Sequence, residues 1–176
     1  MTRSLVRACL SVALCACAAS PSGTAPDGCA AGENPTLDVG AGASEYSALD
    51  DGDAVELVHG AQGGFHVVIA LDGQFLDVVE GSRVPGQITA TIDGVETAVT
   101  SPYLDFRCNP DTGTVQSFGT LLIFTPTEDQ LQGLTPPEFL HGKTAEIHAE
   151  VTDREGRVVT ADRTVVIHDA LFEGAP

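Results

Sequence analysis

The strongest constraint on the fold comes from residues 87–99, where two alternating runs of apolar and polar residues meet at Asp93 and Gly94. Side chains of a strand point alternately to opposite faces, so each run predicts a strand with one apolar face. An Asp-Gly pair suits a two-residue hairpin turn, whose central positions need positive φ. The pairs expected on the apolar face are Ile92 with Val95, Ala90 with Thr97, and Ile88 with Val99.

A second hairpin is expected at residues 145–167. Its first strand alternates small or apolar residues with polar ones, and residues 153–156 supply a turn that ends in glycine. Arg163 falls on the apolar face of the returning strand, so we expect an edge position or a bulge near it.

The rest of residues 35–172 adds short strands separated by turn signals every 8–12 residues. The longest apolar run, residues 65–71, follows a turn that contains Gly60, Gly63 and Gly64 and suits a strand in the middle of the domain. One short helical turn is expected at residues 127–131, since Thr127 is a good N-cap residue. About eight to ten strands with almost no helix predict an all-β domain, an antiparallel immunoglobulin-like β-sandwich.

The N-terminal residues are interpreted as a targeting signal that is separate from the folded domain. Residues 1–16 combine two early arginines with a short apolar segment, which is typical of a secretory signal peptide. Leu14, Cys15, Ala16 and Cys17 resemble a bacterial lipobox, which implies a lipidated N-terminus at Cys17. The alternative is ordinary cleavage at the A-x-A site around Cys17.

Residues 17–34 are rich in Pro, Gly, Ser and Ala and predict a flexible tether between membrane and domain. Ala18 follows the lipidated cysteine, and by analogy with lipoprotein sorting this residue indicates the outer membrane. The expected location is therefore the cell envelope, as an outer-membrane lipoprotein that faces the periplasm or the cell surface.

Cys29 and Cys108 are the two cysteines that remain after the signal segment and the lipidation site Cys17. An even pair in an oxidising compartment is most simply a disulfide, which would pin the end of the tether to the domain. A thiol nucleophile or a metal ligand is the weaker alternative, because neither cysteine has a partner at CxxC spacing.

Charge limits the partners. The 176 residues contain 8 Lys and Arg against 25 Asp and Glu, for a net charge of −17. Nucleic acids and anionic lipid surfaces are bound through Lys and Arg, so this balance argues against both and leaves cations or basic partners open.

Five residues are candidate metal ligands: His59, His66, Glu146, His148 and Glu150. His59 and His66 flank the glycine turn. Glu146, His148 and Glu150 share one face of the first strand of the second hairpin. Histidine and carboxylate can hold Zn²⁺ or Cu²⁺ when a second strand adds a ligand. A solvated strand face explains the same pattern, and the acidic residues 50–53 are interpreted as a turn rather than a Ca²⁺ site.

Catalytic motifs do not emerge. No serine lies in a G-x-S-x-G elbow, and the glycines at residues 60–64 lack the Lys and Ser/Thr of a phosphate loop. We therefore expect neither an enzyme nor a cofactor.

Two stretches carry a resemblance to known proteins. Residues 146–167 resemble the closing strands of immunoglobulin-like bacterial modules. The region 37–71, through the segment at residues 57–71, resembles a pattern of bacterial lipoproteins with immunoglobulin-like domains. No activity is implied by the resemblance. The function expected is a non-enzymatic binding or structural module of the envelope, whose partner is an envelope protein or a polysaccharide. The alternative is a metal-binding envelope protein.

Overall fold

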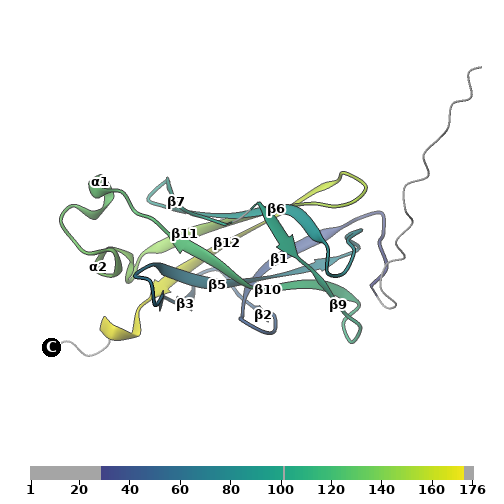
Figure 1. Ribbon diagram of the computed structural model, residues 1–176, viewed down its shortest axis with the longest axis horizontal. Helices are drawn as coiled ribbons and strands as arrows, with labels where there is room; N and C mark the ends of the chain where they lie inside the picture. The colour runs from purple at the N-terminus through teal and green to yellow at the C-terminus, as the bar shows by residue number, and fades with distance from the viewer. Residues whose placement is uncertain (1–28, 101, 173–176) are drawn as a thin grey trace, which may run out of the picture.

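The computed structural model describes residues 29–100 and 102–172, which form twelve strands and three short helical segments (Figure 1). The early strands are β1 (Thr36–Ala41), β2 (Ser47–Ala48), β3 (Asp53–Glu56), β4 (Val58–His59), β5 (Phe65–Gln74) and β6 (Arg83–Ile92). The later elements are β7 (Val95–Val99), β8 (Tyr103–Asp105), β9 (Arg107–Asn109), β10 (Thr114–Phe124), α1 (Glu128–Leu131), α2 (Pro136–Leu140), β11 (Thr144–Thr152), β12 (Val158–His168) and the 3₁₀ turn η1 (Ala170–Phe172).

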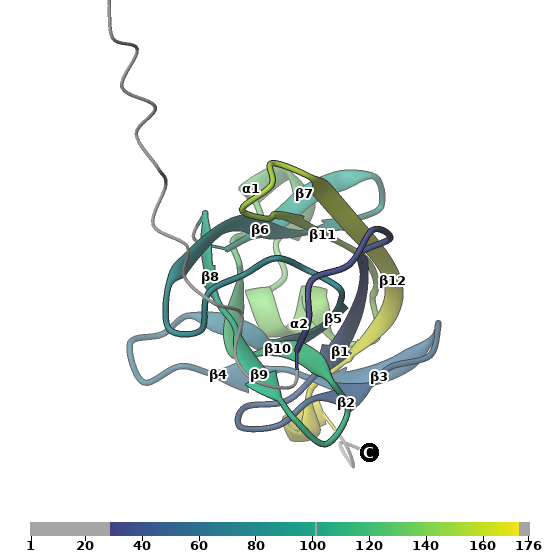
Figure 2. The same cartoon turned by 90° about the vertical axis from the view of Figure 1, so that its right-hand side faces the viewer.

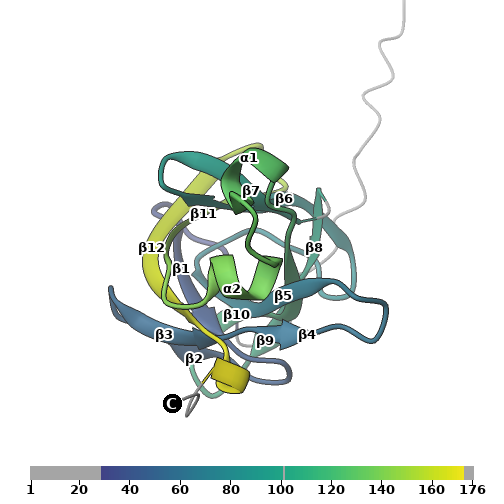
Figure 3. The same cartoon turned by 90° about the vertical axis from the view of Figure 1, so that its left-hand side faces the viewer.

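The strands form one sheet with the order β2-β1-β5-β10-β7-β6-β11-β12-β3. Strand β4 pairs with β5, β8 with β6, and β9 with β10. Every pair is antiparallel except β12 with β3. The sheet curls round on itself, so that seen end-on its strands surround a common core (Figures 2 and 3). The all-β class is thereby confirmed. The immunoglobulin-like sandwich stays a prediction, because hydrogen bonds join the strands into one sheet.

The core is made of apolar side chains on the inner face of the curled sheet. The largest of the fully buried side chains include Phe106, Ile69, Leu71, Ile88 and Leu122. Burial of apolar surface is the main favourable term in folding, so this core stabilises the curled sheet.

The hairpin β11–β12 has the predicted alternation. Ala145, Ile147, Ala149 and Val151 are all buried, and the ladder runs without a shift from Thr144–Val166 to Thr152–Val158. The bulge considered near Arg163 is therefore absent from this ladder. Strand β3 reaches β12 only at residues 165–168, so Arg163 does lie at a local edge, which agrees with the other expectation.

The hairpin β6–β7 has the predicted turn but a different register. Asp93 and Gly94 have φ of 53° and 77°, and Ile92 pairs with Val95 as expected. A bulge then shifts the ladder, so Ala90 pairs with Ala98 and Thr89 with Val99. The other two expected pairs, Ala90 with Thr97 and Ile88 with Val99, are wrong because Thr97 is the extra residue. Its hydroxyl donates to the carbonyl of Val95 at 2.8 Å.

Two ends of the molecule differ in character. Helices α1 and α2 and the 3₁₀ turn lie at one end of the long axis, and β9 lies at the other (Figure 1). Cys108 in β9 forms a disulfide with Cys29, as predicted, with Cα atoms 5.7 Å apart. Strand β10 connects the ends: its first residues pair with β9, and its last residue, Phe124, lies three residues before the N-cap of α1.

The expected signal peptide of residues 1–16, the lipidation site Cys17 and the tether up to residue 28 lie outside the described residues. From Cys29 onward the expected tether contacts the domain, since Cys29 is buried and the N–H of Gly32 donates to the carbonyl of Phe75. Among the described residues, no helix has the length and apolar character needed to cross a membrane.

Candidate functional site

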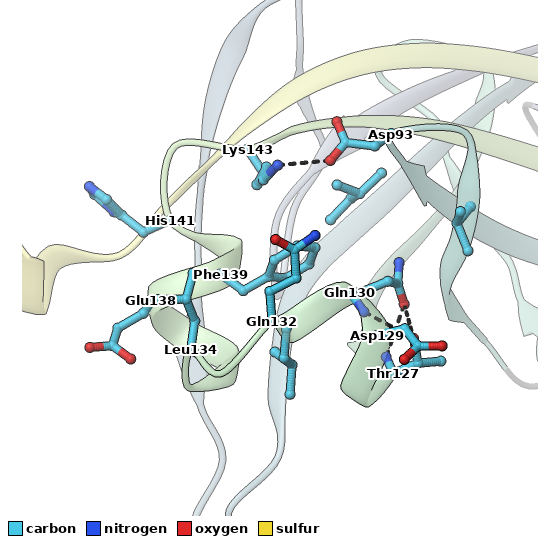
Figure 4. A pocket seen from close by; sticks show the side chains of 13 residues that line it. Asp93, Thr127, Asp129, Gln130, Gln132, Leu134, Glu138, Phe139, His141 and Lys143 are labelled. Atoms are coloured by element: carbon cyan, nitrogen blue, oxygen red, sulfur yellow. Dashed lines mark hydrogen bonds and ion pairs between the residues drawn. The ribbon is translucent and has the colours of Figure 1, made fainter.

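A groove of about 600 Å³ lies at the helical end of the molecule (Figure 4). Its walls are the β6–β7 turn, α1, α2 and the residues between α2 and β11. The residues that line it are Ile92, Asp93, Val95, Thr127, Asp129, Gln130, Leu131, Gln132, Leu134, Glu138, Phe139, His141 and Lys143. None of these is a metal or site candidate of the sequence analysis, so the groove is a site that sequence reasoning missed.

Local hydrogen bonds explain why both short helices begin where they do. Thr127 and Gln130 form a capping box at the start of α1, with the Thr127 N–H donating to Gln130 Oε1 at 2.9 Å. At α2 the carboxylate of Glu138 accepts from the N–H and the hydroxyl of Thr135, at 2.8 and 2.6 Å, and a proline follows the N-cap. The helical turn expected at residues 127–131 is confirmed, whereas α2 was not expected.

The sequence did contain a signal for α2. Threonine, two prolines and glutamate in succession match a capping box with proline at the first helical position. The missed helix supplies Phe139, the aromatic ring at the base of the groove.

The base of the groove is apolar and closely packed. Phe139 and Ile92 are 7% and 1% exposed, so their side chains are largely covered by the domain itself. Val95 and Leu134 also line the groove and are 49% and 50% exposed. Two apolar side chains are thus available to a ligand, whereas Phe139 and Ile92 are already packed.

An ion pair crosses the upper part of the groove. Lys143 Nζ lies 2.8 Å from Asp93 Oδ2 and 5.3 Å from the centroid of the Phe139 ring (Figure 4). The distance to the ring is within the range of a cation–π contact. The Lys143 side chain therefore places its charge between a carboxylate and an aromatic face.

Two further acidic residues lie around the groove, Asp129 on α1 and Glu138 on α2. Within residues 29–100 and 102–172, neither forms an ion pair. Hydrogen bonds from the Thr135 hydroxyl and N–H lower the pKa of Glu138 below its ordinary value, so this carboxylate stays ionised at neutral pH. With three acids and one lysine, the lining carries a negative charge.

A cluster of histidines lies at the same end of the molecule. His59 Nε2 is 2.8 Å from Asp169 Oδ2, and the N–H of Asp169 donates to His141 Nδ1 at 3.1 Å. The rings of His141 and Phe172 have centroids 5.3 Å apart. Asp169 thus ties β4, the end of α2 and the 3₁₀ turn together.

The structure distributes the predicted metal ligands over separate places. His59 contacts Asp169, while His66 lies next to it in the ladder, paired with Val58 and Ile123. Glu146, His148 and Glu150 are exposed on β11, as the alternation predicted, and His148 Nδ1 lies 2.7 Å from Asp162. The described residues contain no group of three or more His, Cys, Asp or Glu side chains that could hold a metal ion.

The acidic residues 50–53 form a turn, in line with their interpretation from the sequence. Asp53 Oδ2 accepts from the N–H of Asp50, and Asp51 Oδ1 accepts from the N–H of Thr164. These carboxylates thus serve the backbone of the turn and of β12.

Comparison of the chain with family models, with curated proteins and with solved structures finds no match. The class of molecule defined by fold and site is therefore an acidic all-β domain with a groove at one end and a disulfide at the other. Its function is argued from these features.

Proposed function

We propose that the protein is an exported, lipid-anchored and non-enzymatic binding module of the bacterial cell envelope, which holds its partner in the groove between the β6–β7 turn and the two helices. The lipobox at Cys17 and the preceding signal segment support the anchor, and the paired Cys29 and Cys108 suit an oxidising compartment.

One observation carries the proposal: the groove and the disulfide lie at opposite ends of the molecule. Cys29 is the first described residue, so the chain enters the domain at the β9 end. Strand β10 covers the distance from that end to α1 with eleven residues, about 35 Å at the usual rise per residue. An anchor at the N-terminus therefore leaves the groove on the side of the domain away from the membrane.

The composition of the groove suits binding. It combines exposed apolar side chains with charged and amide groups, as ligand sites generally do. Gln132 ends α1 in a left-handed conformation, with φ of 50°, and its amide side chain adds a hydrogen-bond donor and acceptor to the lining.

Site-specific photo-cross-linking in living cells tests the proposal. A photoreactive amino acid replaces Leu134 in the groove or, for comparison, Asp111 in the β9–β10 turn at the opposite end. We expect a discrete adduct from position 134 and none from position 111. Adducts of equal yield from both positions, or from position 111 alone, would contradict the groove as the binding site.

A bulky substitution provides the matched control. Val95→Trp fills the groove and is expected to abolish the adduct from position 134. Val158→Trp makes the same change at a residue that is 58% exposed and follows the β11–β12 turn, and it is expected to leave the adduct intact. If both tryptophans act alike, the adduct does not come from binding in the groove.

A further inference from the structure

We infer that the ligand of this groove is a polypeptide segment that carries lysine or arginine next to an apolar side chain. The inference rests on the proposed function, since it names the class of partner for the same groove. Four features of the described residues carry it: the resident lysine, the acids without an ion pair, the exposed apolar side chains, and the net charge.

Lys143 shows how the groove accommodates a cationic side chain. Its stem comes from the residue just before β11, and its ammonium group lies between Asp93 Oδ2, at 2.8 Å, and the face of the Phe139 ring, at 5.3 Å. Lysine and arginine place an apolar stem along apolar surface while the charged head reaches a polar group. The groove thus already holds one side chain of the class that we assign to the ligand.

Charge distinguishes this ligand from an anionic one. Asp93 is 71% exposed even with Lys143 beside it, and Asp129 lies on the opposite wall without an ion pair to any described residue. The whole chain carries a net charge of −17, which attracts cations and repels anions in general. Asp93 and Asp129 each offer a carboxylate of the lining to a cationic side chain of the ligand.

The apolar part of the ligand has its own contacts. Val95 and Leu134 line the groove and are each about half exposed. An apolar side chain of the ligand that contacts them would remove this surface from water, which favours binding. Polysaccharides carry no such apolar side chains, so the polypeptide fits the lining better.

Binding would place a second positive charge beside Asp93. Lys143 opposes the ligand's cation at this carboxylate, because two positive charges would lie beside the same acid and repel each other. Replacing Lys143 by methionine therefore strengthens binding of a cationic peptide, whereas it would weaken binding of an anionic ligand that Lys143 recruits. The sign of this one effect separates the two kinds of ligand.

Nuclear magnetic resonance titration of the intact, isotope-labelled protein measures the effect. The probes are three capped pentapeptides that alternate leucine with arginine, with glutamine or with glutamate. We expect the arginine peptide to shift the resonances of Gln132 and Phe139 and to bind about tenfold or more tightly than the glutamate peptide. We expect Lys143→Met to tighten binding of the arginine peptide by about two- to fivefold, the range of an exposed ion pair.

Variants of the acids complete the test. Asp93→Asn keeps a residue that suits the turn at positive φ, so it removes charge without disturbing the hairpin. Asp93→Asn and Asp129→Asn should each weaken binding of the arginine peptide by about two- to fivefold. Asp111→Asn makes the same charge change at the opposite end and should have no effect.

The outcomes separate the two proposals. Equal binding of the three peptides, or weaker binding of the arginine peptide to Lys143→Met, overturns the ligand class but leaves the groove as the binding site. Shifts confined to residues outside the groove overturn the ligand class as well, and the cross-linking yields at positions 134 and 111 then decide whether the proposed function stands.

Discussion

His59 Nε2 and Asp169 Oδ2 lie 2.8 Å apart, although the two residues are 110 positions apart in the chain and Asp169 is only 1% exposed. The other carboxylate oxygen of Asp169 accepts from the N–H of Leu171 at 3.0 Å. A buried carboxylate depends on such donors, because burial without hydrogen bonds is costly. The pair therefore fastens the C-terminal turn to β4 at the groove end of the molecule.

Replacing His59 by alanine should lower the free energy of unfolding by about 1–3 kcal/mol, since it leaves one oxygen of Asp169 without its donor. His59→Gln keeps an N–H group in reach and should lose less. Urea unfolding at pH 7 measures both. Equal stability of the alanine variant and the wild type would show that the contact contributes nothing.

Asp153 should make stability depend on pH. Burial alone would raise its pKa, but hydrogen bonds from the Arg157 side chain and backbone outweigh burial and lower the pKa below its ordinary value. The folded state therefore holds Asp153 ionised at a pH where the unfolded chain binds a proton. Its contribution is complete above the unfolded pKa, near 4, and is lost as the pH falls through the lowered folded value.

Asp153→Asn tests this sign. The variant should be less stable than the wild type by about 2–3 kcal/mol at pH 7, and the gap should narrow as the pH falls from 4 to 2. Urea midpoints across this range give the gap. Asp111→Asn, at an exposed turn position, should be as stable as the wild type at every pH. A stability difference between Asp153→Asn and the wild type that does not change with pH would refute the lowered pKa of Asp153.

Arg163 should hold β12 to β1, two strands that no ladder joins, where the curled sheet closes on itself. Its guanidinium donates to Asp38 Oδ1 in β1 at 2.6 Å, and the Tyr46 hydroxyl donates to the other oxygen at 3.0 Å. Burial, and then the contact with Asp38, raises the pKa of Tyr46, so the phenol stays protonated and continues to donate. Arg163→Met removes the link between β12 and β1.

The expected cost of Arg163→Met is about 1 kcal/mol, because Asp38 is half-exposed and can be solvated instead. The more specific readout is hydrogen exchange, which should accelerate at residues 36–41 and at residues 162–164. Uniform acceleration over the whole sheet would indicate global destabilisation rather than local separation of β12 from β1.

The disulfide should contribute more than any other single contact considered above. It joins residues 79 positions apart, and chain-entropy models give about 4 kcal/mol for a loop of this length. The double variant Cys29→Ser with Cys108→Ser should lower the free energy of unfolding by about this amount, and the reduced wild type should behave alike. An unchanged urea midpoint would refute the prediction.

The anchor has a direct chemical test. The mass of the processed protein should correspond to a chain that begins at a diacylated Cys17, and Cys17→Ser should remove the lipid. An unmodified chain that starts at Ala18 or later would show ordinary cleavage and exclude the lipid anchor.

Local patterns predicted the local structure. The alternation in residues 145–151 was sufficient for β11 and β12, because their pairing needs only a short turn. The turn at Asp93 and Gly94 was predicted for the same reason, but the bulge at Thr97 was not. A bulge depends on hydrogen bonds with other segments, here the N–H of Thr125 on the Thr97 carbonyl at 2.8 Å.

The pairing of strands that are distant in the chain could not be predicted from the sequence. Strand β5 pairs with β1 and β10, and the sequence pattern of a buried strand is compatible with many such neighbours. The groove was missed for a related reason. Asp93, Asp129 and Lys143 are distant in the chain and match no motif, so only the fold brings them together.

The path of β10 from the disulfide end to the helices has a mechanical consequence. A partner held in the groove and an anchor beyond Cys29 would pull on the domain along its strands. Ladder hydrogen bonds lie perpendicular to antiparallel strands, so neighbouring bonds share such a load in shear instead of opening one after another. The arrangement would let the domain transmit force between partner and membrane without unravelling strand by strand.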